Sequence, residues 1–214
     1  MIISSTCLAG NNTCKPSNNS LRDFTFLKKF RISIHQPKIP ILREVCWTPP
    51  MLNWLKCNID GASNGNPGIA ACGGIFRNYD ADFIYGFAEP LGTTSSFVAE
   101  LSGALRAIEI AFHRNWTHLW IESDSSSVVA AFKNPDKQVA YNLRNRWKNA
   151  LVMLSKMNCV ITHIYREGNQ VADLLANFGL SIPSFAFWTE TPLFIREPFD
   201  KNKLGIPSFR FCSS

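Results

Sequence analysis

The sequence predicts an α/β fold built on one five-stranded mixed sheet that is flanked by helices. Three short apolar segments separated by turn residues come first, which is typical of antiparallel strands. Two further strand-like segments then alternate with segments in which apolar residues recur at helical spacing. Helices packed on a single sheet would bury the apolar faces of both kinds of element.

The first strand is predicted over residues 55–60 and ends on a carboxylate. Apolar residues at its odd-numbered positions alternate with polar ones, which indicates one buried face, and Asp60 stands at the polar end. The following GASNGNPG contains Asn66-Pro67-Gly68, which suits a tight turn. ACGGIFRN and DFIYGFAEPL are the next two strands, and they are joined as a hairpin through residues 79–81.

The helices are predicted in the second half of the domain. Apolar residues recur every three or four positions over residues 97–112, which predicts an amphipathic helix with Ser96 as its N-cap. THLWIES is then a short strand, and the short helix after it begins at Asp124 or Ser125. A basic helix over residues 139–156, the strand NCVITHIY and the helix NQVADLLANFGL complete the order.

Composition and charge divide the chain into three parts. Residues 47–180 form the predicted domain, which begins near a Pro-Pro pair. Residues 1–46 form a basic, Ser/Asn-rich, flexible leader, and residues 181–214 form an extended C-terminal tail. Of the net charge of +6, residues 1–44 contribute seven Lys and Arg against two acids, whereas residues 45–180 hold eleven of each. The basic excess therefore lies mainly outside the domain.

Several classes of protein are excluded by composition. The seven cysteines are scattered and never form a C-x-x-C pair, so neither a disulfide framework nor a zinc site is expected. No apolar run is long enough to cross a bilayer, and the N-terminus lacks the features of a secretory signal. The sequence predicts an intracellular protein of the nucleus or cytoplasm, and it indicates no obligate protein partner. The leader resembles an organelle transit peptide only weakly.

Four acids occupy distinctive places. Asp60 ends the first strand, Glu100 lies in the first long helix, Asp124 follows the fourth strand, and Asp173 lies in the first turns of the last helix. Taken singly, each has a structural explanation as a turn residue, a helix N-terminal acid or a surface residue. Glu100 fits its explanation least, because Phe97 stands where a capping box would need Ser or Thr.

Four segments of the sequence resemble a known family. DGASNGNPG, AEL at 99–101, IESDS at 121–125 and HIYREGNQVADLLAN at 163–177 are similar, in order and spacing, to the landmark segments of the ribonuclease H type 1 family. More narrowly, the chain resembles plant ribonuclease H-like domains related to the reverse-transcriptase-associated domain of non-LTR retrotransposons. The resemblance implies a ribonuclease H-like fold and a Mg²⁺-dependent endonuclease that hydrolyses the RNA strand of RNA–DNA hybrids.

The resemblance also implies a site. The family's carboxylates, matched here by Asp60, Glu100, Asp124 and Asp173, bind two divalent ions, and ligands that are all oxygen suit Mg²⁺, with Mn²⁺ as the alternative. Such ions activate a water and stabilise the leaving 3′-oxygen, so the products carry a 5′-phosphate. Glycines beside Asp60 would clear a path for the nucleic acid. The expected substrate contacts are Gly61, Ser63, Asn66, Ser96 and Arg166 and, on the basic helix, Arg144, Arg146 and Lys148.

Two other functions stay open at the level of sequence. The first is a non-catalytic nucleic-acid-binding relic of a retrotransposon ribonuclease H domain, and the complete acidic set argues against it. The second is integrase-like or exonuclease-like chemistry, against which the glycine-rich turn and REGNQVAD argue. His163 precedes Asp173 by ten residues but falls in an apolar run, so it is predicted to be a packed strand residue. Arg166 is the residue expected at the edge of the site.

Overall fold

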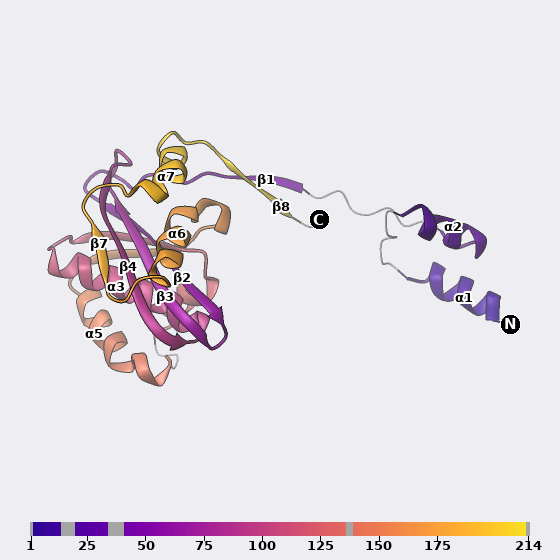
Figure 1. The fold of residues 1–214 in the computed structure, drawn as a ribbon, viewed down its shortest axis with the longest axis horizontal. Helices are drawn as coiled ribbons and strands as arrows, with labels where there is room; N and C mark the ends of the chain where they lie inside the picture. The colour runs from indigo at the N-terminus through magenta and orange to yellow at the C-terminus, as the bar shows by residue number, and fades with distance from the viewer. Residues whose placement is uncertain (1, 14–19, 34–40, 136–138, 213–214) are drawn as a thin grey trace. The chain divides into compact units, whose positions relative to one another are not determined.

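The computed structural model describes residues 2–13, 20–33, 41–135 and 139–212. The chain divides into two compact units, one comprising Glu44–Ser208 and the other comprising Met1–Arg43 with Phe209–Ser214. The larger unit contains the sheet and the helices packed on it (Figure 1). No helix within the described ranges has both the length and the apolar character needed to cross a membrane.

The larger unit is built on a six-stranded mixed sheet of order β6-β5-β2-β3-β4-β7. Neighbouring strands β2, β3 and β4 pair antiparallel, whereas β5 runs parallel to β2 and β6 parallel to β5. The α/β fold, with three antiparallel strands first and two further strands after them along the chain, is therefore confirmed, and β7 adds a sixth strand at the edge of β4. The strands are β2 Leu55–Gly65, β3 Gly68–Arg77, β4 Phe83–Thr94, β5 His118–Ser123, β6 Asn158–His163 and β7 Ala186–Trp188.

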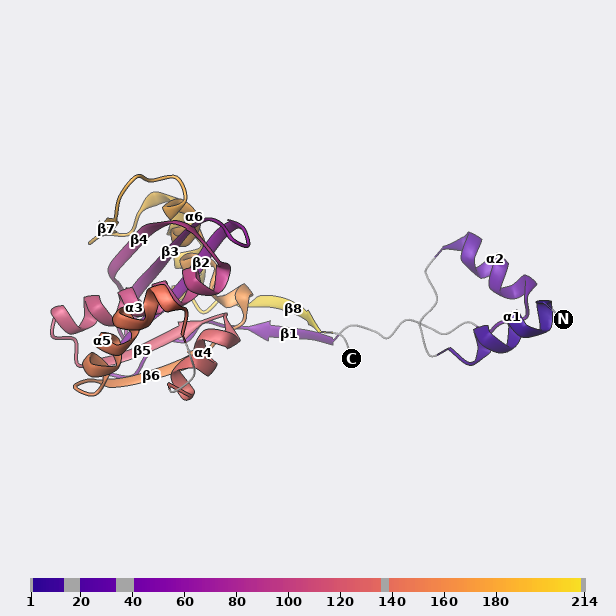
Figure 2. The same cartoon turned by 90° about the horizontal axis from the view of Figure 1, so that it is seen from below.

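Helices cover both faces of this sheet (Figure 2). Cys72 belongs to the apolar cluster that includes α3, whereas a Cβ on the next residue, Gly73, would lie 2.4 Å from the backbone of α6. Because successive strand residues point to opposite faces, α3 and α6 lie on opposite sides of the sheet. The helices are α3 Ser96–His113, α4 Ser126–Lys133, α5 Arg144–Leu154, α6 Gln170–Gly179 and α7 Arg196–Lys203, with 3₁₀ turns at Tyr141–Leu143, Arg166–Gly168 and Leu193–Ile195.

Strand β2 continues past the point where the sequence predicted its end. Its pairing with β3 persists to Gly65, so Asp60 lies inside the strand and the tight turn comes after it. A Cβ on Gly61 would lie 2.3 Å from the backbone nitrogen of Glu100. The close approach of α3 therefore requires a glycine here, and clearance for nucleic acid stays a prediction.

The helix caps also differ from the sequence prediction. Ser95, rather than Ser96, is the N-cap of α3, and its hydroxyl accepts a hydrogen bond from the Val98 N–H at 3.4 Å. Ser125 caps α4 in the same way, so the Asp124 carboxylate is not used as a cap. Both helix starts therefore leave the neighbouring acids available for other contacts. Helix α5 is also shorter than predicted, because its first turn is 3₁₀.

Part of the predicted C-terminal tail packs on the domain. Ile195 and Phe199 are buried against Ile75 of β3 and against α6. The Trp188 ring contacts the Phe178 ring of α6 with centroids 5.4 Å apart. These apolar side chains are removed from water on the α6 side of the sheet. For this reason the segment folds back on the domain instead of remaining extended.

The smaller unit contains helices where a flexible leader was predicted. These are α1 Ile2–Asn11 and α2 Leu21–Lys29. Ser20 caps α2 by accepting the Asp23 N–H at 3.1 Å, which gives this helix a defined start. Strand β1, Ile41–Val45, pairs with β8, Ser208–Cys212, in a separate two-stranded sheet.

Candidate active site

Three carboxylates from distant parts of the chain meet at one place. Asp60 comes from β2, Glu100 from α3, and Asp124 from the residue after β5, and one oxygen of each lies within 4.8 Å of the others. The parallel register that pairs Ile59 with Ser123 brings Asp60 and Asp124 side by side. The close passage of α3 over Gly61 brings Glu100 to them.

Asp173, the fourth predicted acid, lies beside this group without joining it. It is in the first turn of α6, and its Oδ1 is 3.4 Å from a guanidinium nitrogen of Arg166. Its charge nevertheless contributes to raising the pKa values of Asp60 and Asp124. Asp173 therefore adds to the negative charge at the site of the other three carboxylates.

The environment of the cluster disfavours uncompensated negative charge. Burial, followed by the charge of Asp124, raises the pKa of Asp60 to about 8. Burial, followed by the charge of Asp60, raises the pKa of Glu100 to about 9. Burial is also the main cause of the raised pKa of Asp124. A cation at the cluster would restore the ionised forms.

Two oxygens of the cluster are buried without a hydrogen-bond partner among the residues that the structure describes. They are Oε2 of Glu100 and Oδ1 of Asp124. A buried acceptor left unpaired costs about 1–3 kcal/mol, and more when it carries charge. Carboxylate oxygens without nitrogen or sulfur ligands suit a hard divalent cation such as Mg²⁺. The residues present therefore fit a metal ion of this kind.

The raised pKa values predict how the stability of the metal-free protein depends on pH. The unfolded chain ionises near the ordinary pKa values of 3.8 and 4.5, whereas folded Asp60 and Glu100 keep their protons to about pH 8 and about pH 9. Between these limits the folded state binds more protons, so the free energy of unfolding should fall as pH rises from about 4 to about 9. Thermal unfolding in EDTA across this range measures the effect.

The control for this pH dependence is the double variant Asp60→Asn, Glu100→Gln, which removes both titrations. Its melting temperature should vary less with pH than that of the unmodified chain, and Mg²⁺ should stabilise the unmodified chain more at pH 9 than at pH 5. A double variant with an equally steep profile would assign the pH dependence to other groups.

His163 and Arg166 both flank the acids. His163 lies in β6 as predicted, but it is the last residue of the strand, its side chain is exposed, and its Nε2 is 3.1 Å from the backbone oxygen of Asp124. The prediction that His163 is packed is therefore wrong, because the sheet ends at this residue and the packed run continues with Ile164. Arg166 is exposed in a 3₁₀ turn and is held near the site by Asp173.

Four predicted substrate contacts lie around the turn between β2 and β3. The Ser63 hydroxyl donates to the Gly65 carbonyl at 2.6 Å, and the Asn66 side-chain oxygen accepts the Ser96 N–H at 3.1 Å. The second bond ties the turn to the start of α3, the helix that carries Glu100. Contact of Gly61, Ser63, Asn66 and Ser96 with a substrate stays a prediction.

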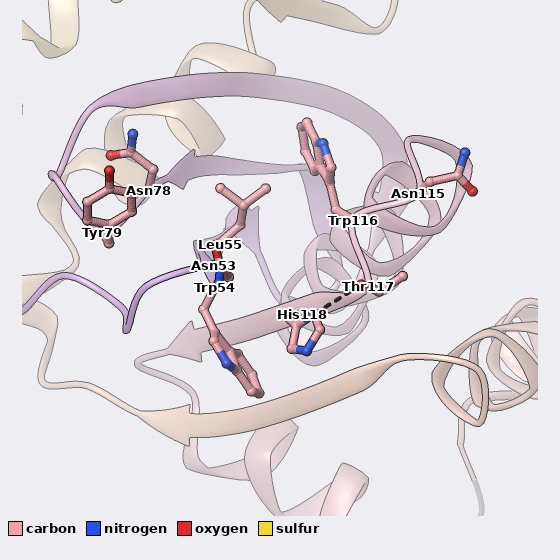
Figure 3. A pocket seen from close by; sticks show the side chains of 9 residues that line it. All are labelled: Asn53, Trp54, Leu55, Asn78, Tyr79, Asn115, Trp116, Thr117 and His118. Carbon is pink, nitrogen blue, oxygen red and sulfur yellow. Dashed lines mark hydrogen bonds between the residues drawn. The ribbon is translucent and has the colours of Figure 1, made fainter.

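A pocket of about 310 Å³ lies at the other end of the parallel strands (Figure 3). It includes Leu55 and His118, the first residues of β2 and β5, whereas the acids lie toward the ends of these strands. It contains none of the predicted site residues. The lining residues are Asn53, Trp54, Leu55, Asn78, Tyr79, Asn115, Trp116, Thr117 and His118.

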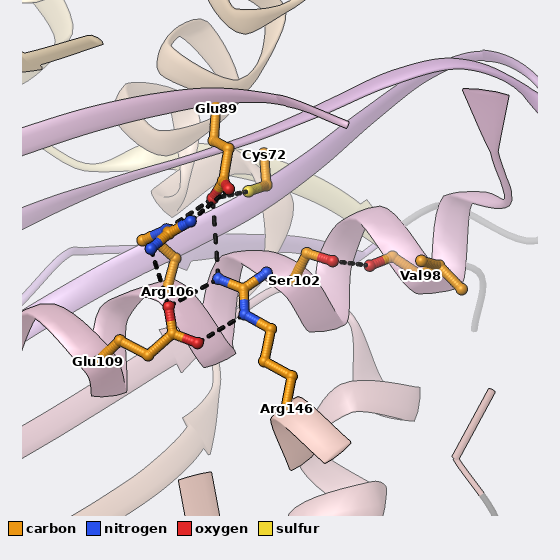
Figure 4. Close-up of polar contacts among 7 residues, drawn as sticks. All are labelled: Cys72, Glu89, Val98, Ser102, Arg106, Glu109 and Arg146. Carbon is orange, nitrogen blue, oxygen red and sulfur yellow. Dashed lines mark hydrogen bonds and ion pairs between the residues drawn. The ribbon is translucent and has the colours of Figure 1, made fainter. Parts of the chain in front are cut away.

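The predicted basic group on α5 separates into two kinds of residue. Arg146 forms two hydrogen bonds with Glu109 of α3, at 2.6 and 2.8 Å, and lies 3.8 Å from Glu89 of β4 (Figure 4). Arg106 bonds the same two glutamates, so Arg146 holds α5 against α3, and its contact with a substrate stays a prediction. Arg144 and Lys148 are exposed on the same helix.

Sequence reasoning missed a group of buried polar residues next to the acids. Lys56 and Asn58, which read as the polar face of β2, are completely buried, and Arg77 of β3 is 1% exposed. Lys56 pairs with Glu122 of β5 at 2.9 Å, and Trp47 covers the guanidinium of Arg77. The alternation of polar residues in β2 was visible, but nothing in the sequence showed that this face is covered.

Comparison with known proteins identifies the family. The model of a family described as reverse transcriptase-like matches residues 58–179, a span that includes all four acids. An Arabidopsis thaliana protein named as a ribonuclease H protein is 34% identical over 152 residues, which are 71% of this chain and 24% of that protein. The chain belongs to the ribonuclease H family.

Other members of the ribonuclease H family agree with this result. Ribonuclease HI of Halobacterium salinarum is 30% identical over 122 residues, which are 56% of this chain and 61% of that protein. The crystal structure of ribonuclease H1 from this archaeon superposes with a TM-score of 0.54 at 28% identity, over 59% of this chain and 97% of the other. The N-terminal ribonuclease H domain of a Mycobacterium tuberculosis protein gives 0.54 at 25% identity, over 59% and 93%. This chain thus spans only part of both relatives found by sequence.

Proposed function

We propose that this chain hydrolyses the RNA strand of RNA–DNA hybrids and requires Mg²⁺ to do so. The observation that carries the proposal is the group of buried Asp60 with half-buried Glu100 and Asp124 in a ribonuclease H fold, where two buried carboxylate oxygens have no partner among the described residues. The names of the Arabidopsis and Halobacterium relatives support the reaction type.

Each residue has a separate part in this proposal. Asp60, Glu100 and Asp124, with Asp173 beside them, would hold two Mg²⁺ ions, or Mn²⁺ in their place. Bound divalent ions supply Lewis-acid activation at the scissile phosphate. Arg166 is exposed and always charged, so it can hold a phosphate but cannot exchange protons. Selection of RNA for cleavage requires contacts with 2′-hydroxyl groups.

A non-catalytic nucleic-acid-binding relic is the second candidate, and the cluster argues against it. Three carboxylates with raised pKa values, one buried and two half-buried, destabilise a metal-free fold. A chain that only bound nucleic acid would gain stability by losing one of them. Descent from a plant retrotransposon and a place in the nucleus or cytoplasm also belong to the proposal, and the Arabidopsis relative supports the plant origin alone.

A cleavage assay on three matched duplexes tests the function. An RNA–DNA hybrid, a double-stranded RNA and a double-stranded DNA of one sequence are incubated with the protein in Mg²⁺, in Mn²⁺ and in EDTA. The expected result is cutting of the RNA strand of the hybrid alone, only with a divalent ion, to fragments with 5′-phosphates. Hybrid binding without cutting in either metal would support the relic instead.

Arg144 and Lys148 are expected to contribute to hybrid affinity through phosphate contacts. The double variant Arg144→Gln, Lys148→Gln should weaken hybrid binding and reduce the slope of log K against log salt by about 1–2, because each phosphate contact releases counterions. Binding titrations between about 50 and about 200 mM salt measure this slope.

The matched control for the α5 variant is Lys201→Gln, Lys203→Gln on α7, which removes the same charge from another exposed helix. An equal slope change in both double variants would mean that only total charge matters. Arg146→Gln should instead lower thermal stability, because it leaves Glu109 without its bidentate partner.

A further inference from the structure

One buried amide links the two strands that carry Asp60 and Asp124. Asn58 lies two residues before Asp60 and therefore on the same face of β2. In the parallel pairing of β2 with β5 it stands opposite Glu122, which precedes Asp124 by two residues. The Nδ2 of Asn58 donates to Oε2 of Glu122 at 3.1 Å. This bond therefore joins β2 to β5 at the position two residues before each acid.

The same amide also reaches the helix that carries Asp173. Its Nδ2 donates to Oδ1 of Asn169 at 3.2 Å, and Asn169 precedes Asp173 by one turn. Asn169 stands at the N-cap of α6, yet its side chain makes no capping bond. Instead its Nδ2 donates to the backbone oxygen of Ile59 at 3.0 Å. The side chain is thus used to join α6 to β2 next to Asp60.

The hydrogen-bonding capacity of Asn58 is completely used. Its Oδ1 accepts from Nε1 of Trp47 and from a guanidinium nitrogen of Arg77, both at 2.8 Å. With the two bonds donated to Glu122 and Asn169, both donors and both lone pairs of the amide have partners. The partners also fix the amide orientation, since Glu122 requires a donor and Arg77 an acceptor. No other side chain of this size can make all four bonds.

The surroundings make these bonds rigid. Asn58 is 0%, Asn169 1% and Glu122 6% exposed, so water has little access to replace a lost partner. Lys56 pairs with the other oxygen of Glu122 at 2.9 Å, and this balances the charge of the carboxylate. A shift of any one element would therefore leave buried polar groups unpaired.

We infer that Asn58 is a positioning residue that holds β2, β5 and α6 in the arrangement that assembles the cation site of Asp60, Asp124 and Asp173. The inference rests on the proposed function in one respect, namely that these acids bind Mg²⁺. The hydrogen bonds described for the Asn58 side chain reach none of these acids, so its effect must pass through the strands and Asn169. Its loss should weaken Mg²⁺ binding while leaving contacts with the hybrid intact.

Calorimetric titration of the full chain with Mg²⁺ tests the inference. Asn58→Leu, which keeps the number and branching of the side-chain heavy atoms but removes all four bonds, should raise the Mg²⁺ dissociation constant about 10–100-fold, as expected when groups that orient metal ligands are lost. Asn169→Ser disrupts fewer bonds and should raise it less. Combining the two should give less than the product of the single effects, because both act through one network. In cleavage assays, high Mg²⁺ should restore kcat, with KM for the hybrid unchanged.

Trp147→Leu is the control for general destabilisation, because Trp147 is buried in α5, which carries none of the acids. It should lower the melting temperature without changing Mg²⁺ affinity in the folded protein. If Asn58→Leu folds and its Mg²⁺ affinity is unchanged, the inference is overturned and the proposed function stands. If Asn58→Leu does not fold, unchanged Mg²⁺ affinity in Asn169→Ser has the same meaning. If the unmodified chain does not bind Mg²⁺, or binds it equally well after Asp60→Asn, the proposed function and the inference both fail.

Discussion

Replacing Asp124 by Asn is expected to abolish hybrid cleavage, with a loss of at least about 10³-fold, because residues that act as one unit lose function together. The substitution removes one carboxylate from three whose oxygens lie within 4.8 Å, so the remaining pair cannot hold ions as the full set does. Thermal stability without metal should stay equal or rise, because a buried charge next to Asp60 and Glu100 is removed. Cleavage rates and melting temperatures measured in parallel separate the two effects.

Asp80→Asn is the matched control for this substitution. It makes the same chemical change at an exposed acid in the turn between β3 and β4, and cleavage should be unaffected. An Asp124→Asn protein that unfolds would show that the residue is structural. A folded variant with unchanged cleavage in Mg²⁺ would exclude the acidic cluster as the reaction centre.

The sequence predicted most of the sheet and three members of the cluster, for identifiable reasons. Periodicity is a local property, so the strands and the long helix could be located from apolar spacing alone. The acids could be assembled only because their segments resemble a family whose order and spacing are known. For Glu100 the local sequence also excluded a capping box, because Phe97 stands where that motif needs Ser or Thr.

What the sequence could not predict depends on which surfaces become covered. Lys56 and Asn58 have the spacing of an exposed strand face, but Trp47 and the segments around α6 and α7 cover that face. Arg146 differs from Arg144 only in its position around α5, and only the neighbouring helix shows that it faces Glu109. Such assignments need the tertiary arrangement, because residue type and local spacing are the same in both cases.

The C-terminal segment that covers this face of the sheet is expected to contribute strongly to the stability of the domain. Phe199→Ala should lower the free energy of unfolding by about 3–5 kcal/mol, the usual cost of truncating a buried phenylalanine. Phe199 is 6% exposed, and its ring meets that of Phe83 with centroids 6.1 Å apart. Together with Ile195 it covers Ile75 of β3, so its loss leaves a cavity against the central sheet. Urea unfolding followed by circular dichroism measures the change.

Leu193→Ala is the control within the same segment, because Leu193 is 79% exposed. Its effect should stay within about 0.5 kcal/mol, as for most surface substitutions. A large difference between the two variants requires that the segment folds back on the sheet, since a loose tail would tolerate both changes equally. Equal small effects would mean that the domain is stable without the packing of residues 186–203. In the structure, Asn202 of α7 bonds Arg77 at 3.0 Å and so covers the bonds around Asn58. Those bonds would then have to form without this cover.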